Sequence, residues 1–320
     1  MSERTPSGTR DVLPDEMREL RALTDRTRGT FEAAGYGEVY TPALEFERDS
    51  NAATGPGAAS YRMFDERGNV LVLRSDMTVP IARLVGTRYS ATPGPLRFCY
   101  VAHSYRSVGS HRGHAREVLQ AGVELIGAPA PEGTVEALTV LCDALDAAGL
   151  TGYRVGVGDA TLYPVLLERL GVAAERRSEI LRDLSVGDFV GVESQLSWLG
   201  LAPEDAELLI SVPRMRGGPE LLAGIDPRLA DAAGGLRQVY DALPPRVAER
   251  VIFDFGLVRN LGYYTGVLFQ VYDDAIGEPI GSGGRYDELL AQFGRPEPAV
   301  GFALNVELLH TAVAGEERDG

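Results

Sequence analysis

The spacing of apolar residues divides the chain into two β-rich portions separated by a long helical stretch. Apolar residues recur at helical spacing over residues 14–34, 79–89 and 131–148, which predicts three helices in the first portion. Short apolar runs bounded by Gly, Pro or polar residues predict strands at residues 36–40, 70–73, 96–106, 116–126 and 153–157. Residues 49–60, rich in Asn, Ala, Gly and Ser, are expected to form a loop.

From residue 162 to 243 the pattern is almost wholly helical, and it becomes β-rich again at Val251. The remaining predictions are strands at residues 251–255, 264–272 and 299–303, a glycine-rich bend at 281–284, a short helix at 285–293, and a last helix from about residue 305. Two β-rich portions separated by helices predict one antiparallel α+β domain. We expect residues 1–160 and 245–320 to form it, interrupted by a helical insertion at residues 161–244.

The predicted strand at residues 116–126 has an unusual face. Side chains alternate along a strand, so one face carries Leu119, Ala121, Val123 and Leu125, and the other carries Arg116, Val118, Gln120, Gly122, Glu124 and Ile126. A partly enclosed polar pocket on the floor of the sheet explains the mixed composition of the second face. In it, Glu124 would offer acceptors to an ammonium group, and Gln120 a donor and an acceptor. An edge strand with ordinary surface groups explains the same pattern, and both interpretations stay open.

Two other segments carry candidate functional side chains. Asp76 and Thr78 lie where a predicted strand passes into a helix, a place where functional groups are often held, although Asp76 is equally suited to cap the helix. Arg259, Tyr263 and Tyr264 lie between two predicted strands. Such a density of Gly, Tyr and Arg between apolar strands is typical of a small-molecule site rather than of plain core.

Composition narrows the function classes. The 320 residues carry a net charge of −15, which argues against a broad nucleic-acid surface. Cys99 and Cys142 form no CxxC pair, so a reduced, cytoplasmic setting is expected. No signal peptide and no run of about 20 apolar residues is present, so we expect an unexported protein without a membrane span. His111 and His114 lack further ligands at characteristic spacing, and we predict no metal and no cofactor.

Seven segments, in order over nearly the whole chain, resemble class II aminoacyl-tRNA synthetases, specifically histidyl-tRNA synthetase. They are GTRDVLP, YGEVYTPALE, LRSDMT, RFCYVAHSYR with REVLQAGVELIG, LVRNLGYYTG, GSGGRYDELL and PAVGFALNVELL. The resemblance implies a class II antiparallel sheet flanked by helices, with Arg106 at the second class motif, where an arginine grips the nucleotide phosphate. It also implies a histidine-binding set, which we take as Asp76, Thr78, Arg106, Gln120, Glu124, Arg259, Tyr263 and Tyr264.

The chain departs from the synthetases at the third class motif. There the synthetases end in Gly-Leu-Glu-Arg, whose arginine clamps ATP, whereas this chain has Asn-Val-Glu-Leu at residues 305–308. Because Leu308 cannot make that charge-assisted contact, adenylate formation should be crippled. His114 and Gly262 stand where the synthetases usually have arginine and aspartate. Only an acidic tail follows the last predicted helix, so we expect no anticodon-binding domain.

This combination is similar to the regulatory subunits of ATP phosphoribosyltransferase, the first enzyme of histidine biosynthesis. The resemblance implies a non-catalytic protein that activates a short catalytic subunit, which carries the active site, and that conveys feedback inhibition by L-histidine. It further implies a synthetase-like dimer within a mixed oligomer, typically an octamer. Two alternatives stay open: a truncated, histidine-activating enzyme similar to histidyl-tRNA synthetase, and an ATP-independent histidine-binding scaffold with another partner.

Overall fold

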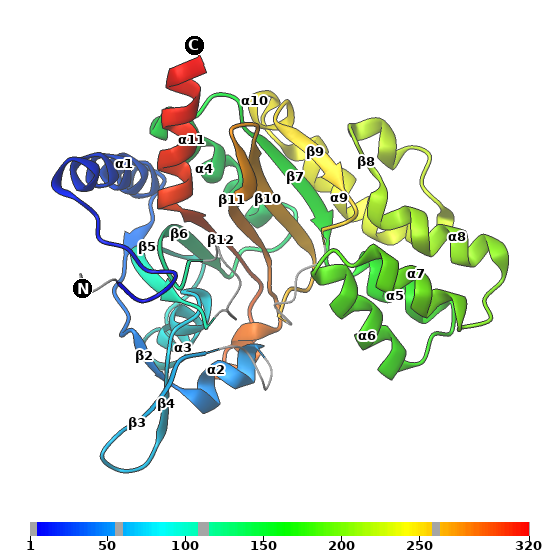
Figure 1. The fold of residues 1–320 in the computed structure, drawn as a ribbon, viewed down its shortest axis with the longest axis horizontal. Helices are drawn as coiled ribbons and strands as arrows, with labels where there is room; N and C mark the ends of the chain where they lie inside the picture. The colour runs from blue at the N-terminus through cyan, green and yellow to red at the C-terminus, as the bar shows by residue number, and fades with distance from the viewer. Residues whose placement is uncertain (1–4, 55–59, 108–114, 258–262, 320) are drawn as a thin grey trace.

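The computed structural model describes residues 5–54, 60–107, 115–257 and 263–319. Within them, a nine-stranded sheet with the order β1-β5-β6-β12-β11-β10-β7-β9-β8 forms the centre of the protein (Figure 1). Its strands are β1 Gly37–Glu38, β5 Leu96–Tyr105, β6 Glu117–Ile126, β7 Arg154–Asp159, β8 Arg216–Gly217, β9 Val251–Asp254, β10 Val267–Asp273, β11 Ile276–Arg285 and β12 Ala299–Asn305. A smaller sheet has the order β2-β4-β3, with β2 Leu44–Phe46, β3 Arg62–Phe64 and β4 Val70–Leu73.

The six central strands, from β5 to β7 in the sheet order, pair antiparallel, as predicted. Parallel pairs occur only near the two ends of the described sheet, where β1 joins β5 and β9 joins β7. The α+β fold class is therefore confirmed. Because β6 lies between β5 and β12, the interpretation of residues 116–126 as an edge strand is wrong.

Three helices cover one face of the sheet: α1 Pro14–Ala33, α4 Glu132–Ala148 and α11 Val306–Asp319 (Figure 1). Their apolar side chains share a core with Ala121, Val123 and Leu125, the apolar face predicted for β6. The other face packs on α3 Thr78–Arg88 and η4 Leu289–Phe293, and its core includes Ile126. The two predicted faces of β6 are thus confirmed, and the mixed one faces α3.

The stretch predicted to be helical contains mostly helices, at one side of the sheet (Figure 1). They are α5 Leu162–Arg169, α6 Ala174–Ser185, α7 Phe189–Ser197, α8 Pro203–Ser211, η1 Val212–Arg214, η2 Pro219–Leu222, η3 Pro227–Leu229 and α9 Ala230–Ala242, followed by α10 Pro245–Ala248. The stretch also supplies β8, which pairs with β9. Two residues are too few to show a strand periodicity, so the sequence pattern misses β8. The division into a core and an insertion stays a prediction.

Two local predictions are wrong. Residues 49–54 belong to helix α2 Glu47–Thr54 rather than a loop, and its first turn carries Glu47 and Asp49, which favour a helix N-terminus. The glycines at 281–284 are not a bend but part of strand β11. A side chain at Gly283 would collide with the Gly301 carbonyl and the Phe269 ring, so glycine serves close strand packing here.

Three boundaries also shift. The strand predicted from residue 264 begins at Val267, and the helix predicted over residues 285–293 is reduced to the 3-10 helix η4. The strand predicted at residues 36–40 shortens to β1. Among the described helices, none is both long and apolar enough to cross a membrane.

Candidate functional site

Glu124 lies at the centre of the mixed face and is 1% exposed. The Thr78 hydroxyl donates to its Oε1 at 2.6 Å, and the Tyr286 hydroxyl donates to its Oε2. Burial raises the pKa of Glu124 to about 8; the two hydroxyl donors oppose this shift, and the nearby carboxylate of Asp76 adds to it. The site therefore surrounds a buried carboxyl group with neutral donors.

Space for this carboxylate comes from Gly301, which is paired with Glu124 across β12 and β6. A Cβ at Gly301 would collide with Glu124 Oε2 and with the Val123 carbonyl. Glycine at this position is thus a requirement of the site as much as of the sheet.

Asp76 follows β4 and is half-buried. Its Oδ1 accepts from the Val79 N–H at 3.0 Å, and its Oδ2 accepts from the Ser75 hydroxyl at 3.2 Å. The Asp76 side chain thus satisfies an N–H group in the first turn of α3, as a capping residue does, although Met77 occupies the N-cap position itself. Burial raises the pKa of Asp76, and the positive charge of Arg106 opposes the shift. The hydrogen bond from the Val79 N–H also fixes the position of the Asp76 carboxylate, which lies close enough to Glu124 to affect its pKa.

Tyrosine side chains complete the surroundings of the two carboxyl groups. The hydroxyls of Tyr263 and Thr78 are hydrogen-bonded, and the Tyr263 ring lies 4.9 Å from that of Tyr264 and 5.9 Å from that of Tyr286, centroid to centroid. Burial raises the pKa of Tyr100, Tyr263 and Tyr286 well above the ordinary range, so these hydroxyls stay protonated. We call Asp76, Thr78, Tyr100, Glu124, Tyr263 and Tyr286 the carboxylate–tyrosine cluster.

Two members of the cluster, Tyr100 and Tyr286, are absent from the set predicted from the sequence. Tyr100 pairs with Gly122 across β5 and β6, so strand periodicity on β5 could have placed it on the mixed face. Tyr286 follows β11 and lies in the segment GSGGRYDELL, but nothing in its spacing indicates a contact with Glu124.

Gln120 lies on the same face of β6 and is 7% exposed. Its Oε1 has no hydrogen-bond partner among the residues that the structure describes. Leaving a buried amide oxygen unpaired costs about 1–3 kcal/mol. Gln120 is therefore suited to accept a hydrogen bond from a ligand.

The predicted cations differ in position from the rest of the set. Arg106 is exposed just beyond the end of β5, where its charge acts on Asp76. Arg259 lies outside the described residues, as do His111, His114 and Gly262. Within the described part of the chain, no group of three His, Cys, Asp or Glu side chains is placed to hold a metal ion.

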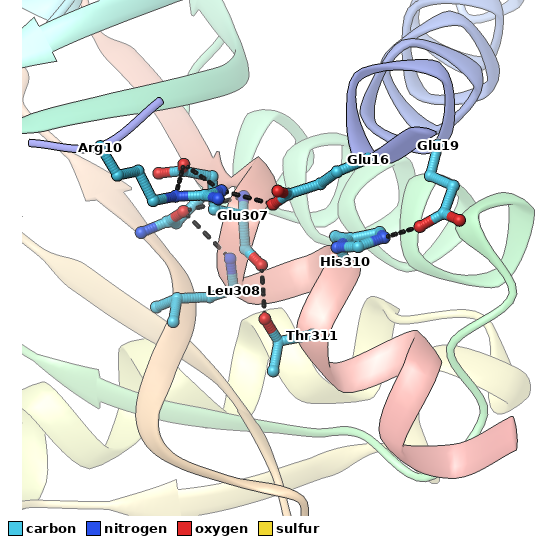
Figure 2. A network of polar contacts seen from close by, with 8 residues as sticks. Arg10, Glu16, Glu19, Glu307, Leu308, His310 and Thr311 are labelled. Carbon is cyan, nitrogen blue, oxygen red and sulfur yellow. Dashed lines mark hydrogen bonds and ion pairs between the residues drawn. The ribbon is translucent and has the colours of Figure 1, made fainter. Parts of the chain in front are cut away.

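The start of α11 shows what surrounds Leu308 (Figure 2). The N–H groups of Glu307 and Leu308 donate to Asn305 Oδ1 at 3.0 and 3.2 Å, so Asn305 caps the helix. Arg10 bridges Glu307 at 2.8 Å and Glu16 at 2.6 Å, while the Leu308 side chain points away from these ion pairs. The Glu307 carboxylate is thus paired with Arg10 of the N-terminal segment, and the side chain at position 308 is apolar.

Comparison with known proteins places the chain in a family. The profile described as histidyl-tRNA synthetase matches residues 8–309. An ATP phosphoribosyltransferase regulatory subunit from Symbiobacterium thermophilum is 41% identical over 316 residues, covering 95% of this chain and 78% of the relative. The chain belongs to the family of ATP phosphoribosyltransferase regulatory subunits. Another regulatory subunit of this family, from Desulforamulus reducens, is 38% identical, covering 97% of this chain and 79% of the relative.

A solved structure supports the same family at the level of the fold. It is described as an ATP phosphoribosyltransferase regulatory subunit/histidyl-tRNA synthetase from Bacillus halodurans, and it matches with a TM-score of 0.88 and 32% identity, covering 98% of this chain and 84% of that one. The resemblance to the regulatory-subunit family and the class II synthetase-like fold are therefore confirmed. The profile match at residues 8–309 includes the whole carboxylate–tyrosine cluster and Leu308.

Proposed function

We propose that this protein is the regulatory subunit of a short-form ATP phosphoribosyltransferase, required for its activity and for histidine feedback in the first step of L-histidine biosynthesis. Relatives with that name cover most of the chain. The observation that carries the proposal is a contrast within one synthetase-like fold: the carboxylate–tyrosine cluster is present, whereas Leu308 stands at the position of the ATP-clamping arginine.

The cluster has the chemistry to bind histidine. Asp76 and Glu124 offer carboxylate oxygens to the ammonium group and to an imidazole N–H. Gln120 has a buried amide oxygen without a partner among the described residues. Arg106 is exposed close enough to influence Asp76, and it offers a positive charge to the ligand carboxylate. We propose the full predicted set, including Arg259, as the histidine site.

Position 308 supports a role without adenylate chemistry. Transfer at the phosphates of ATP depends on positioned positive charge, which leucine lacks. Glu307 is already paired with Arg10. We therefore place the catalytic site on the partner chain and assign this chain the control of that site.

A regulatory subunit can control the catalytic site only when it is bound to the catalytic subunit. We propose that the protein forms a synthetase-like dimer and joins the catalytic subunit in a mixed oligomer, an octamer being the expected form. Histidine bound at the cluster then favours one state of the assembly. Because such coupling is reciprocal, histidine affinity should change by the same factor when the partner or its substrates bind.

Reconstitution tests the proposal. The rate of the short catalytic subunit is measured alone, with this protein, and with this protein plus histidine. We expect a large increase on adding the protein and inhibition by histidine only in the mixture. An unchanged rate and unchanged histidine sensitivity would overturn the proposal. Histidine-dependent exchange of pyrophosphate into ATP by this protein alone would favour the histidine-activating enzyme instead.

A further inference from the structure

A cavity of about 380 Å³ lies between the sheet and the N-terminal segment, residues 5–13. The sheet contributes His103 of β5 and Glu117 and Leu119 of β6. Side chains alternate along a strand, so Glu117 and Leu119 lie on the opposite face of β6 from Glu124. The sheet therefore separates this cavity from the carboxylate–tyrosine cluster. Its volume lies within the range of small-molecule sites, about 300–1,000 Å³.

The N-terminal segment is attached on two sides of the cavity. The Gly8 carbonyl accepts a hydrogen bond from the Arg116 N–H at 2.8 Å, just before β6. The Arg10 guanidinium pairs with Glu307 at 2.8 Å and with Glu16 at 2.6 Å, at the starts of α11 and α1 (Figure 2). The cavity thus has a wall that is bonded to three other elements of the fold.

Hydrogen-bond acceptors outweigh cations around the cavity. On the sheet side, the Glu117 carboxylate lies 4.0 Å from His103 Nε2, and a neutral imidazole also accepts a hydrogen bond. On the helix side, Arg10 donates to Oε1 of Glu307, and a carboxylate can accept several further bonds. With histidine counted as neutral, the three carboxylates of Glu16, Glu117 and Glu307 and the one guanidinium of Arg10 give a formal charge of −2. The cavity therefore favours a cation that donates hydrogen bonds, and the net charge of −15 favours its approach.

The acceptors are separated by apolar surface. The strand β6 lies between β5, which carries His103, and β12, which leads directly to Glu307. Neighbouring strands are about 4.8 Å apart, so the backbone positions of the two flanks are about 10 Å apart. Leu119 lies on β6 between them, and Val12 of the N-terminal segment also lines the cavity. A molecule with positive groups at its two ends and an apolar middle matches this arrangement.

We propose that this cavity binds a linear aliphatic amine with two ammonium groups. One ammonium group donates to Glu117 and His103, the other donates to Glu307, and the methylene chain lies against Leu119 and Val12. Hydrogen bonds between ammonium and carboxylate groups are charge-assisted and stronger than neutral ones. The site is separate from the proposed histidine site and does not depend on it.

Titration calorimetry of the full-length protein tests the proposal. The probe is 1,4-diaminobutane, and the controls are butan-1-amine, which keeps one ammonium group, and butane-1,4-diol, which keeps none. We expect saturable binding of the diamine that weakens as salt is added, because the groups that line the cavity are partly exposed. The monoamine should bind about three- to tenfold more weakly, and the diol should not bind. Absence of diamine binding, or equal binding of the monoamine, would overturn the proposal.

Variants locate the bound amine. Glu117→Gln and Glu307→Gln each remove one charged acceptor, and each should weaken diamine binding about three- to tenfold. Ala115→Leu reduces the space at the edge of the cavity without changing its charge, and it should also weaken binding. Glu66→Gln is the matched control, since Glu66 is exposed in the turn between β3 and β4 (Figure 1). Equal weakening by Glu66→Gln would mean that net charge alone attracts the amine, which would overturn the proposal.

A further variant separates the two faces of the sheet. Glu124→Gln changes the carboxylate–tyrosine cluster, so it should bind the diamine as the wild type does. Loss of diamine binding in Glu124→Gln would place the amine in the cluster and overturn the proposal. Histidine inhibition is measured without amine, so its outcome is independent of this site. Failure of diamine binding with intact histidine inhibition would thus overturn the amine site alone.

Discussion

The carboxylate–tyrosine cluster and the start of α11 differ in how firmly the fold holds their side chains. In the cluster, Glu124 is bonded to Thr78 and Tyr286, which lie on other elements, and its carboxylate occupies space left by Gly301. At the start of α11, the cap and the ion pair involve Asn305 and Glu307, and Leu308 takes part only through its backbone. A change in the cluster therefore leaves buried groups unpaired, whereas position 308 can vary at little structural cost. The fold thus holds the side chains of the cluster in place, whereas it does not depend on the side chain at position 308.

The largest effect is expected at Glu124. Glu124→Gln removes a carboxyl group that a cationic group of bound histidine would favour in its ionised form, and hydrogen bonds to charged groups contribute about 1.5–3 kcal/mol, so histidine inhibition should weaken about 10- to 100-fold. The measurement is the histidine concentration that halves the rate of the reconstituted enzyme. Glu117→Gln, on the same strand, should leave that concentration unchanged. If histidine inhibited the wild type, Glu124→Gln and Glu117→Gln equally, the effector site would lie elsewhere.

The next largest effect is expected for a substitution at Gly301. In Gly301→Ala the new methyl group meets Glu124 Oε2 and the Val123 carbonyl, and overpacking of this kind costs about 1–3 kcal/mol. Denaturant unfolding should show this loss, and histidine affinity should fall with it. Gly277→Ala is the matched control on β11, since a Cβ there meets nothing within 4 Å. If both variants unfolded alike, the coupling of sheet packing to the site would be wrong.

A smaller effect is expected for the ion pair between Arg10 and Glu307. Both side chains are partly exposed, so Arg10→Ala should lower the free energy of unfolding by about 0–1 kcal/mol, and less at high salt. A double-mutant cycle with Glu307→Gln isolates the pair. A coupling well above this range would show that the N-terminal segment is held to α11 more firmly than the geometry indicates.

The smallest effect on stability is expected at position 308. Leu308→Arg should change the free energy of unfolding by less than about 0.5 kcal/mol, because the cap on Asn305 uses only the backbone N–H of Leu308. The wild type should show no histidine-dependent pyrophosphate exchange above background. Strong destabilisation by Leu308→Arg would mean that leucine was selected for packing, which would weaken its use as a sign of lost ATP chemistry.

Local patterns predicted much of the fold and part of the site. Alternation along residues 116–126 separated Glu124 and Gln120 from the apolar face correctly, because side-chain direction on a strand depends only on the backbone. The residue type and position of Asp76 indicated a side chain that could accept a hydrogen bond from the start of a helix, as it does from the Val79 N–H, although Met77 is the N-cap residue. In contrast, the same reasoning predicted a bend at the glycines 281–284, which lie in strand β11. Glycine is needed there because neighbouring strands and rings pack too closely for a side chain, and local sequence does not show such contacts.

The sequence by itself determined most of the element types, the two faces of β6, the family and the absence of an arginine at position 308. Only the tertiary structure decided which groups surround Glu124. Thr78 is 46 residues away from it and Tyr286 is 162 residues away, so no local periodicity relates them. The raised pKa of Glu124 has the same origin: an isolated glutamate is ionised at neutral pH, whereas burial raises the pKa of Glu124 to about 8 against the effect of the two hydroxyl donors.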